Sequence, residues 1–469
     1  MMKGVRDRRS GKTVVVSAPL EDDKKNEGVV VLRRNLIVGL LSLVLVLSLS
    51  GLGFAYTFAT YSEKPFAGTE INVALVAEPR SDGLMKLLPE FEELTGIKVN
   101  LAILPYPNLQ EQQAVALAQR TGAYDVVHVD CVWVGQYAGQ GWTIPVEDFI
   151  AKTNPEVLAI DDFFPLVLEG QGMWEGQVFG LPFIQAVFGL YYRTDLFEKY
   201  GLEVPETWDE LYEVVKFLDE KERDNGIHGF SFMGRRGVQL QCTWDNIIWS
   251  MGGDWYDENY RPTLDSPEAI AATEYLKSLI PFCPVGVLSY DWDENAAAFA
   301  QGKSAVTIQW QNAAPQFVNP ETSRIVGNWN FAMVPGVRQE DGSVRRAPTF
   351  GGWSLMIPTD APNKDAAWEF IVWATSPEME KKLAYTGAGS RRSSLSDPEL
   401  SAIYIEYEAM IPSLDVAKAR PNIPPYSEMA DAIEVALSEA MSGEKTAEQA
   451  MKEANQRLEM ILRRAGFLR

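Results

Sequence analysis

The sequence predicts an α/β protein with two lobes around a ligand cleft, preceded by an N-terminal transmembrane helix. Three features of the 469-residue chain support this prediction. An uncharged apolar stretch occupies residues 36–58. A pattern of alternating strands and helices follows it, which is typical of a parallel sheet covered by helices. The rest of the chain is dominated by helical patterns, and a cleft between such parts is where small ligands usually bind.

The apolar stretch Leu36–Phe58 is long enough, as a helix, to cross a hydrocarbon core of about 30 Å. Arg33 and Arg34 precede it, which favours a cytoplasmic N-terminus and an exported body. We assign residues 1–34 to a cytoplasmic leader, 35–59 to a transmembrane anchor or signal segment, and 60–69 to a linker. No cysteine follows for lipid attachment, and Thr57-Phe58-Ala59 is a weak cleavage site. An uncleaved anchor is favoured, and cleavage with secretion is the alternative.

Composition excludes several classes of function. The formal net charge of -22 argues against nucleic acid as a partner, because phosphates require basic patches. Three cysteines and two histidines are too few for a disulfide scaffold, a zinc site or histidine-based catalysis. A single bridge between Cys242 and Cys283 is one possibility. No phosphate loop, nucleophile elbow or metalloprotease motif occurs, so we expect neither a cofactor nor an enzyme.

The exported body begins with a regular alternation. Strand patterns and helix patterns follow one another as Ile71–Val76 (strand), Leu84–Leu94 (helix), Ile97–Ile103 (strand), Leu109–Gln119 (helix) and Asp125–Val129 (strand). This order predicts βαβαβ with parallel strands.

The middle and the end of the body change to long helices. Thr207 with Glu210 fits a capping box, Ser266-Pro267 opens a second helix, and Thr446 begins a third that runs to Arg464. We therefore predict an N-terminal α/β lobe of residues 70–185 plus about 306–358. A helix-rich C-terminal lobe would comprise residues 186–305 plus about 359–469.

Aromatic residues stand out among the candidate ligand contacts. Of the 13 tryptophans, Trp310 ends a strand pattern before a polar turn, and Trp353 follows Gly351 and Gly352. Sugars offer flat C–H faces and rings of hydroxyls, which match aromatic platforms and planar hydrogen-bonding groups. Glu78 and Asp130 each end a predicted strand, at the edge of a parallel sheet where ligands gather.

Seven segments in order resemble the family 1 extracellular solute-binding proteins, the sugar receptors of ABC importers, and the trehalose/maltose-type branch most closely. The resemblance extends from about Thr69 to the C-terminal helix. The segments that carry it are Leu87–Leu101, Tyr124–Phe149, Gly189–Leu211, Trp249–Asp254 (WSMGGD), Gly302–Trp310, Gly351–Pro358 (GGWSLMIP) and Arg420–Tyr426. The resemblance implies a two-lobed, type II periplasmic-binding-protein-like fold.

The resemblance also implies roles for individual residues. Hydroxyl groups of a sugar would bond to Glu78, Asp130 and Arg420, and its pyranose faces would stack on Trp310 and Trp353. The backbone N–H of Gly352 would be a further donor. The sequence departs from the family pattern at two cleft positions, where an acid is common in relatives and where Asn246 and Gln185 stand here. A site built around hydroxyls discriminates steeply, so these departures leave the sugar unnamed.

The function implied by the resemblance is capture of a mono- or oligosaccharide outside the cell and its delivery to ABC permease subunits. The body would be extracytoplasmic and held at the cell membrane by its single N-terminal helix. Two alternatives stay open at this point: the same fold binding a polyamine or a sugar phosphate, or an anchored glycosidase using Glu78 and Asp130.

Overall fold

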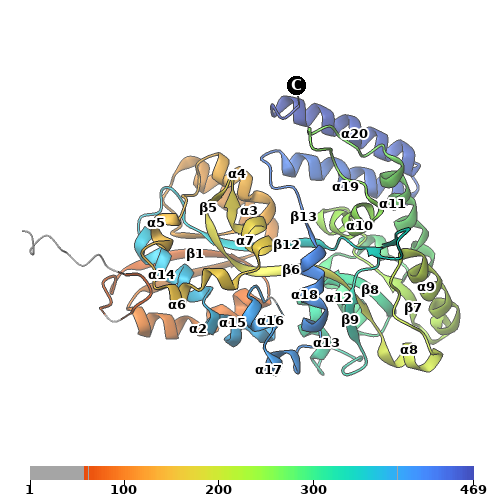
Figure 1. The fold of residues 1–469 in the computed structure, drawn as a ribbon, viewed down its shortest axis with the longest axis horizontal. Coiled ribbons are helices and arrows are strands. Elements are labelled where there is room, and N and C mark those ends of the chain that lie inside the picture. The colour runs from red at the N-terminus through yellow and green to blue at the C-terminus, as the bar shows by residue number, and fades with distance from the viewer. Residues whose placement is uncertain (1–56, 62, 388, 469) are drawn as a thin grey trace, which may run out of the picture. The chain divides into compact units, whose positions relative to one another are not determined.

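The computed structural model describes residues 57–61, 63–387 and 389–468. Its central element is a nine-stranded mixed sheet. The strand order is β2-β1-β3-β12-β6-β8-β7, with β13 added to β12 and β9 added to β6 (Figure 1). The strands are β1 (Glu70–Val76), β2 (Lys98–Leu104), β3 (Val126–Asp130), β6 (Gly180–Tyr192), β7 (His228–Ser231), β8 (Ser304–Trp310), β9 (Asn330–Met333), β12 (Thr349–Met356) and β13 (Lys418–Ala419).

The predicted βαβαβ unit is confirmed at one end of this sheet. Strands β1, β2 and β3 are parallel, and α2 (Pro79–Thr95) and α3 (Tyr106–Gln119) connect them. Helix α2 ends at Gly96, whose φ of 76° is the left-handed conformation that a helix C-terminus commonly needs. The carboxyl ends of β1 and β3 therefore point the same way and carry Glu78 and Asp130.

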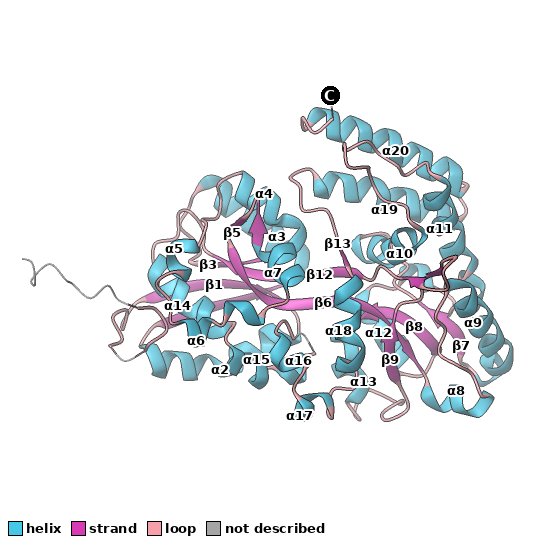
Figure 2. Ribbon diagram, viewed as in Figure 1, coloured by secondary structure: helices cyan, strands magenta, loops and turns pink. Residues whose placement is uncertain are grey.

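Strand β6 joins the two lobes. Its first half pairs with β12, which in turn pairs with β3, and its second half pairs with β8 and β9. Helices gather around both ends of the sheet (Figure 2). We call the end around β1–β3 the first lobe and the end around β7–β9 the second lobe. All but the last of the 13 residues of β6 are buried, which fits a central strand covered on both faces.

Packing differs from the predicted division of the chain in two places. Strands β8 and β9 pair with β6 and belong to the second lobe, although residues from about 306 were assigned to the first. Helix α14 (Lys364–Ala374) contacts α2 and α6 (Pro155–Leu158) and belongs to the first lobe, although residues from about 359 were assigned to the second. Apolar periodicity identifies an element but not the lobe on which it packs.

The remaining helices cover the two ends of the sheet. Those near the first lobe are α4 (Val134–Gly139), α5 (Glu147–Ile150), α7 (Pro165–Gly172) and α15 (Pro377–Lys382). The others are α8 (Thr194–Tyr200), α9 (Trp208–Glu222), α10 (Val238–Met251), α11 (Pro267–Ser278), α12 (Trp292–Ala300), α13 (Ala314–Val318), α16 (Arg392–Leu395), α17 (Pro398–Ser401), α18 (Tyr407–Val416), α19 (Tyr426–Ser442) and α20 (Ala447–Arg464). Two small hairpins complete the fold: β4 (Met173–Trp174) with β5 (Gln177–Val178), and β10 (Val337–Arg338) with β11 (Val344–Arg345).

Local capping signals in the sequence are confirmed. Helices α9 and α20 begin at Thr207 and Thr446, each with a reciprocal capping box, and α11 begins after Ser266 with Pro267 in its first turn. In each case the side-chain oxygen satisfies a backbone N–H that would otherwise lack a partner.

The predicted membrane segment lies outside the described residues except for its end. Phe58 pairs with the body instead: its N–H donates to the Lys152 carbonyl at 2.9 Å, and only 6% of the residue is exposed. The predicted boundary at residue 59 is therefore too late, because Phe58 and the neighbouring Ala59 are core residues. Among the described residues, no helix combines the length and the apolar character needed to cross a bilayer.

The suggested bridge between Cys242 and Cys283 is wrong. Both cysteines are free and buried, as is Cys131. The Cys283 Sγ donates to the Leu279 carbonyl at 3.3 Å, and burial raises the pKa of the Cys242 thiol. Each thiol is used for packing in its own surroundings.

Candidate ligand-binding site

The order β3-β12-β6 brings most of the predicted site residues together. Asp130 at the end of β3 is directly opposite Trp353 on β12, and Gly352 is opposite Gln185 on β6. Adjacent strands thus place residues more than 160 positions apart side by side. Trp310 reaches the same region from β8, where it pairs with Phe188 of β6.

A buried ion pair stands at the centre of this region. Arg420 Nη2 donates to Asp130 Oδ1 at 3.1 Å, and the two residues are 6% and 3% exposed. Tyr106 donates its hydroxyl to Asp130 Oδ2 at 3.1 Å, and Arg420 Nη1 donates to the Tyr426 hydroxyl at 3.4 Å. Both charges are compensated and held in fixed directions, as burial requires.

Trp310 lies against the arginine of this pair. The Arg420 guanidinium carbon is 5.9 Å from the Trp310 ring centroid, within reach of a cation–π contact. The indole Nε1 donates to Gln239 at 2.7 Å, which fixes the ring. A Cβ on Gly351 would lie 2.8 Å from the indole, so only glycine allows β12 to come this close.

Trp353 is half-buried in an aromatic cluster. Its ring lies 4.8 Å from His128, 5.2 Å from Trp133 and 5.5 Å from Tyr106, measured between centroids. The ring is edge-on to Trp133 and Tyr106, an arrangement that holds an aromatic plane firmly. Trp353 can therefore act as a rigid platform.

Glu78 combines a structural role with an unused oxygen. One carboxylate oxygen accepts the Ser81 N–H at 2.9 Å and caps α2. The other oxygen, Oε2, is buried and has no hydrogen-bond partner within the described ranges. Burial raises the pKa of Glu78 to about 7, against the lowering effects of the Ser81 N–H and of Arg80. Near neutral pH this carboxyl both accepts and, when protonated, donates.

Arg80 is a candidate site residue that the sequence did not predict. It forms an ion pair with Glu380 of α15, and both side chains are fully buried. Its guanidinium stacks on Phe183 at 5.1 Å, yet Nε and Nη1 have no partner in the described part of the chain. The signal available was its position two residues after Glu78, in the first turn of α2.

His128 is the second missed residue. Its Nδ1 accepts the Val76 N–H at 3.3 Å, so the ring proton is on Nε2, which has no partner among the described residues. Burial, with a contribution from the charge of Arg80, lowers the pKa of His128 well below its usual value and keeps the ring neutral. Its ring lies 5.5 Å from Phe183, so it shares a neighbour with Arg80.

Two predicted contacts have other roles in this structure. The Asn246 amide donates to the Cys242 carbonyl at 2.7 Å, and its oxygen accepts the Thr349 N–H at 2.7 Å, so it fixes the start of β12 to α10. Gln185 is fully buried, with its side chain oriented to donate to the Gly389 carbonyl at 2.8 Å. We leave both out of the proposed ligand set.

The charges of the site are internally balanced. Asp130 is paired with Arg420, and Arg80 is paired with Glu380. Over the stretches that the structure describes, no group of three or more histidine, cysteine or acidic side chains could hold a metal ion. The site therefore offers aromatic faces and scattered donors and acceptors.

The family follows from comparison with known proteins. Residues 77–381 match the model of the bacterial extracellular solute-binding proteins, and the chain belongs to this family. It therefore has the two-lobed α/β fold of periplasmic binding proteins, with an extracytoplasmic body that binds a solute for an ABC importer. Because the family consists of binding proteins, a catalytic role is not its defining activity.

Three similar proteins illustrate the range of solutes for which members of this family are named. A probable amino-acid ABC transporter periplasmic-binding protein of Sinorhizobium fredii is 27% identical, over 93% of this chain and 99% of its own length. A mannitol-binding protein of Pseudomonas aeruginosa is 27% identical, over 82% of this chain and 91% of its own. The ribitol complex of an ABC transporter solute-binding protein from Agrobacterium radiobacter K84 has a TM-score of 0.78 and 30% identity, and covers 84% of this chain and 99% of its own.

Proposed function

We propose that this chain captures an uncharged, hydroxyl-rich solute, a polyol or a sugar, and delivers it to the permease of an ABC importer. The observation that carries the proposal is a set of buried polar atoms of the candidate site residues that have no hydrogen-bond partner among the described residues. These atoms are Glu78 Oε2, Arg80 Nε and Nη1, His128 Nε2 and Arg420 Nε.

Unpartnered buried polar atoms cost free energy, on the order of 1–3 kcal/mol each, unless a ligand pairs them. This set contains both donors and acceptors. A hydroxyl group donates and accepts at the same time, so a chain or ring of hydroxyls satisfies such a mixed set. The half-buried face of Trp353 suits the C–H side of the same molecule. One relative is named for binding mannitol, and another was crystallised with ribitol, and both solutes are consistent with this chemistry.

The charge balance disfavours the alternatives. A sugar phosphate needs an uncompensated cation, whereas Arg420 and Arg80 each face a carboxylate. A polyamine or an amino acid needs an uncompensated carboxylate for its ammonium group, and burial keeps Glu78 partly neutral near pH 7. A glycosidase would need a second carboxylate beside Glu78 that is free to act as nucleophile or base, but Asp130 already accepts from Arg420, Tyr106 and the Val132 N–H.

Solute binding would be coupled to closure of the lobes. Asp130 and Trp353 belong to the first lobe, and Trp310 belongs to the second. A ligand that contacts both sides stabilises the closed arrangement because only that arrangement offers all of its contacts. The closed body is then the form that the permease recognises.

We propose further that an uncleaved N-terminal helix tethers the body to the membrane. The support is the uncharged stretch that follows Arg33 and Arg34 in the sequence. The weak cleavage site is also embedded in the body: Phe58 and Ala59 are buried, and the Ala59 N–H donates to Glu369 Oε2 at 3.0 Å. Cleavage after Ala59 would remove these contacts.

A binding panel tests the proposed solute class. Purified protein is titrated with ribitol, D-mannitol, D-glucose, maltose, spermidine, glucose 6-phosphate and L-glutamate, using tryptophan fluorescence and calorimetry. We expect a response to at least one of the four neutral compounds and more than tenfold weaker binding of that compound by Trp353→Ala. The control is Trp142→Ala, a half-buried tryptophan that packs edge-on against Tyr137 and is outside the proposed ligand set. Binding of only the charged compounds, or unchanged affinity in Trp353→Ala, would refute the proposal.

A further inference from the structure

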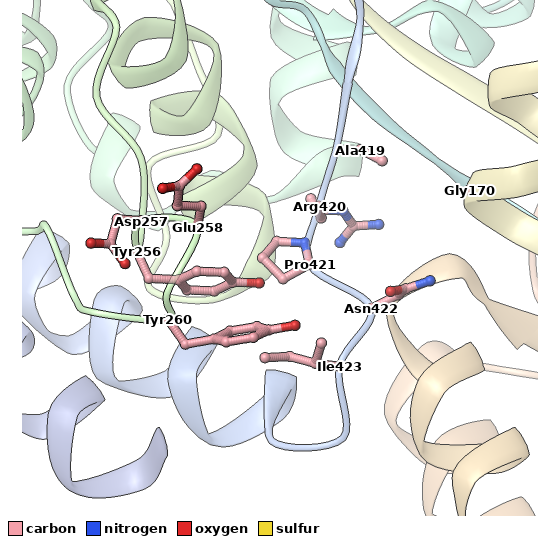
Figure 3. Close-up of a pocket in the computed structure, with 10 residues that line it drawn as sticks. All are labelled: Gly170, Tyr256, Asp257, Glu258, Tyr260, Ala419, Arg420, Pro421, Asn422 and Ile423. Carbon is pink, nitrogen blue, oxygen red and sulfur yellow. The ribbon is translucent and has the colours of Figure 1, made fainter. Parts of the chain in front are cut away.

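A pocket opens next to the central ion pair. It has a volume of about 360 Å³, within the range of roughly 300–1,000 Å³ that small-molecule sites occupy. Figure 3 shows Tyr256 and Tyr260 projecting from one loop toward the segment that carries Arg420, Pro421, Asn422 and Ile423. Of the residues predicted from the sequence, only Arg420 lines this pocket.

The loop that carries the two tyrosines is held in place at both ends. Trp255 donates its Nε1 to Asp245 at 2.8 Å and stacks on Tyr426 at 5.7 Å. Asp257 Oδ1 accepts the N–H groups of Asn259 and Arg261 at 2.8 and 2.9 Å. Tyr260 has a φ of 59°, a left-handed conformation that costs free energy for a bulky residue and persists only where the surroundings impose it. The tyrosines are therefore positioned before any ligand arrives.

One hydrogen-bonded chain connects this loop to the central site. Arg420 donates to Tyr426, Tyr426 donates to Gln241 Oε1 at 3.0 Å, and Gln241 donates to Asp245, which also holds Trp255. Only 6% of Arg420 is exposed, and its Nε has no hydrogen-bond partner in the described part of the chain. The pocket and the central site thus share one arginine, which bonds Asp130 on one side and lines the pocket on the other.

The lining has the chemistry of a sugar subsite. Two half-buried tyrosine rings, 5.4 Å apart, offer flat apolar surface with hydroxyls at their tips. Asn422 adds an amide, and Pro421 and Ile423 add apolar contacts. Two acids also line the pocket: Asp257 accepts two backbone N–H groups, and Glu258 is exposed at the rim, where its carboxylate can accept hydrogen bonds from hydroxyl groups.

We propose that this pocket is an extension subsite, which holds a second hydroxylated unit linked to the one bound at Asp130 and Trp353. The inference rests on the proposed function. It specifies the solute as a two-unit molecule, such as a glycosyl-polyol or a disaccharide, in which the second ring packs on Tyr256 and Tyr260 beside Arg420. No covalent step is involved.

Matched ligands of one and two units test the inference. The one-unit probes are D-mannitol and D-glucitol, and the two-unit probes are maltitol (a glucosyl-glucitol) and maltose. The variants are Tyr256→Ala and Tyr260→Ala, with Tyr212→Ala as the control, a half-buried tyrosine of α9 that packs on Phe282. Calorimetry gives each affinity, and thermal melting confirms that each variant is folded.

We expect wild-type protein to bind at least one two-unit probe tenfold or more tightly than any one-unit probe. Tyr256→Ala and Tyr260→Ala should each weaken the affinity for that probe at least fivefold and the affinity for one-unit probes less than twofold. Binding of one-unit probes alone would overturn the extension subsite and leave the proposed function standing. Failure of all four probes, with a response to spermidine, would overturn both. Equal losses for both probe classes would show that the tyrosines only support the central site.

Discussion

At the scale of single residues, Glu78 has a structural role and, in the proposed function, a second role as a ligand contact. It caps α2 through one oxygen and leaves the other buried and unpaired. Burial raises its pKa from an ordinary value of 4.5 to about 7. A carboxyl whose pKa is higher in the folded protein than in the unfolded chain stabilises the fold at low pH. That contribution declines as the pH rises from the unfolded to the folded pKa, between about 4.5 and 7.

We therefore predict that Glu78→Gln changes the pH dependence of stability. The free energy of unfolding of the solute-free wild-type protein should fall by up to about 3 kcal/mol between pH 4.5 and 8 because of this group, since each pKa unit corresponds to about 1.4 kcal/mol. The variant cannot ionise and should lose correspondingly less, while its solute affinity falls. Urea unfolding at pH 5 and pH 8 measures the difference. The control is Glu111→Gln on the exposed side of α3, and identical pH profiles for Glu78→Gln and wild type would contradict the prediction.

At the scale of elements, β12 is the strand on which the site depends. It pairs with β3 on one side and β6 on the other, and its start is fixed by Asn246 of α10. Its two glycines remove side chains where Trp310 and Gln171 approach. Gln171 Nε2 donates to the Gly351 carbonyl at 3.1 Å, so α7 also holds this part of the strand. The strand therefore presents Trp353 in one orientation.

Gly352→Ala tests this dependence. Gly352 has a φ of 140°, and an added Cβ would lie 2.0 Å from Gln171 Nε2 and 2.3 Å from the Ile184 carbonyl oxygen. Strain and overpacking together should cost about 2–4 kcal/mol of unfolding free energy. Gly139→Ala is the matched control, since Gly139 is helical, exposed and has no atom within 3.4 Å of a Cβ. Denaturant unfolding of both variants gives the comparison, and equal stability would exclude the close approach at Gly352.

Elements were the level best predicted from the sequence. The first three strands, the helices between them and the capping residues Thr207, Ser266 and Thr446 follow from local periodicity and turn chemistry. The long strand β6 carried no such signal, because nearly all of its residues are buried and it shows no alternation. The lobe assignments of β8, β9 and α14 were wrong for a related reason: partners far apart in the sequence determine them.

At the scale of the whole molecule, Phe58 and Ala59 fix the start of the described body, and both are buried. Phe58 lies against Phe149 at 5.6 Å between ring centroids, and Ala59 is bonded to Glu369 of α14. The exported body therefore begins earlier in the chain than the predicted linker.

Fractionation of cells tests the tether. Full-length protein should stay with the membrane after an alkaline carbonate wash and be released by detergent. A variant lacking residues 35–56 but carrying a cleavable secretion signal should appear in the soluble fraction with unchanged solute affinity. Mass spectrometry of the wild-type protein should find the intact N-terminus. A mature N-terminus near residue 60 in the culture medium would refute the anchor.

The sequence by itself determined the family resemblance, the order of the first elements and the apolar N-terminal stretch. It also predicted Glu78, Asp130, Trp310, Trp353 and Arg420 as candidate ligand contacts, because these predictions depend on local patterns and short motifs. Tertiary structure alone decided which of them meet, since β12 brings Trp353 opposite Asp130 and places Trp310 beside Arg420. It also revealed Arg80 and His128, and it gave Asn246 a structural role. Whether a polar atom is paired or left for a ligand depends on neighbours hundreds of residues away, and local sequence does not specify them.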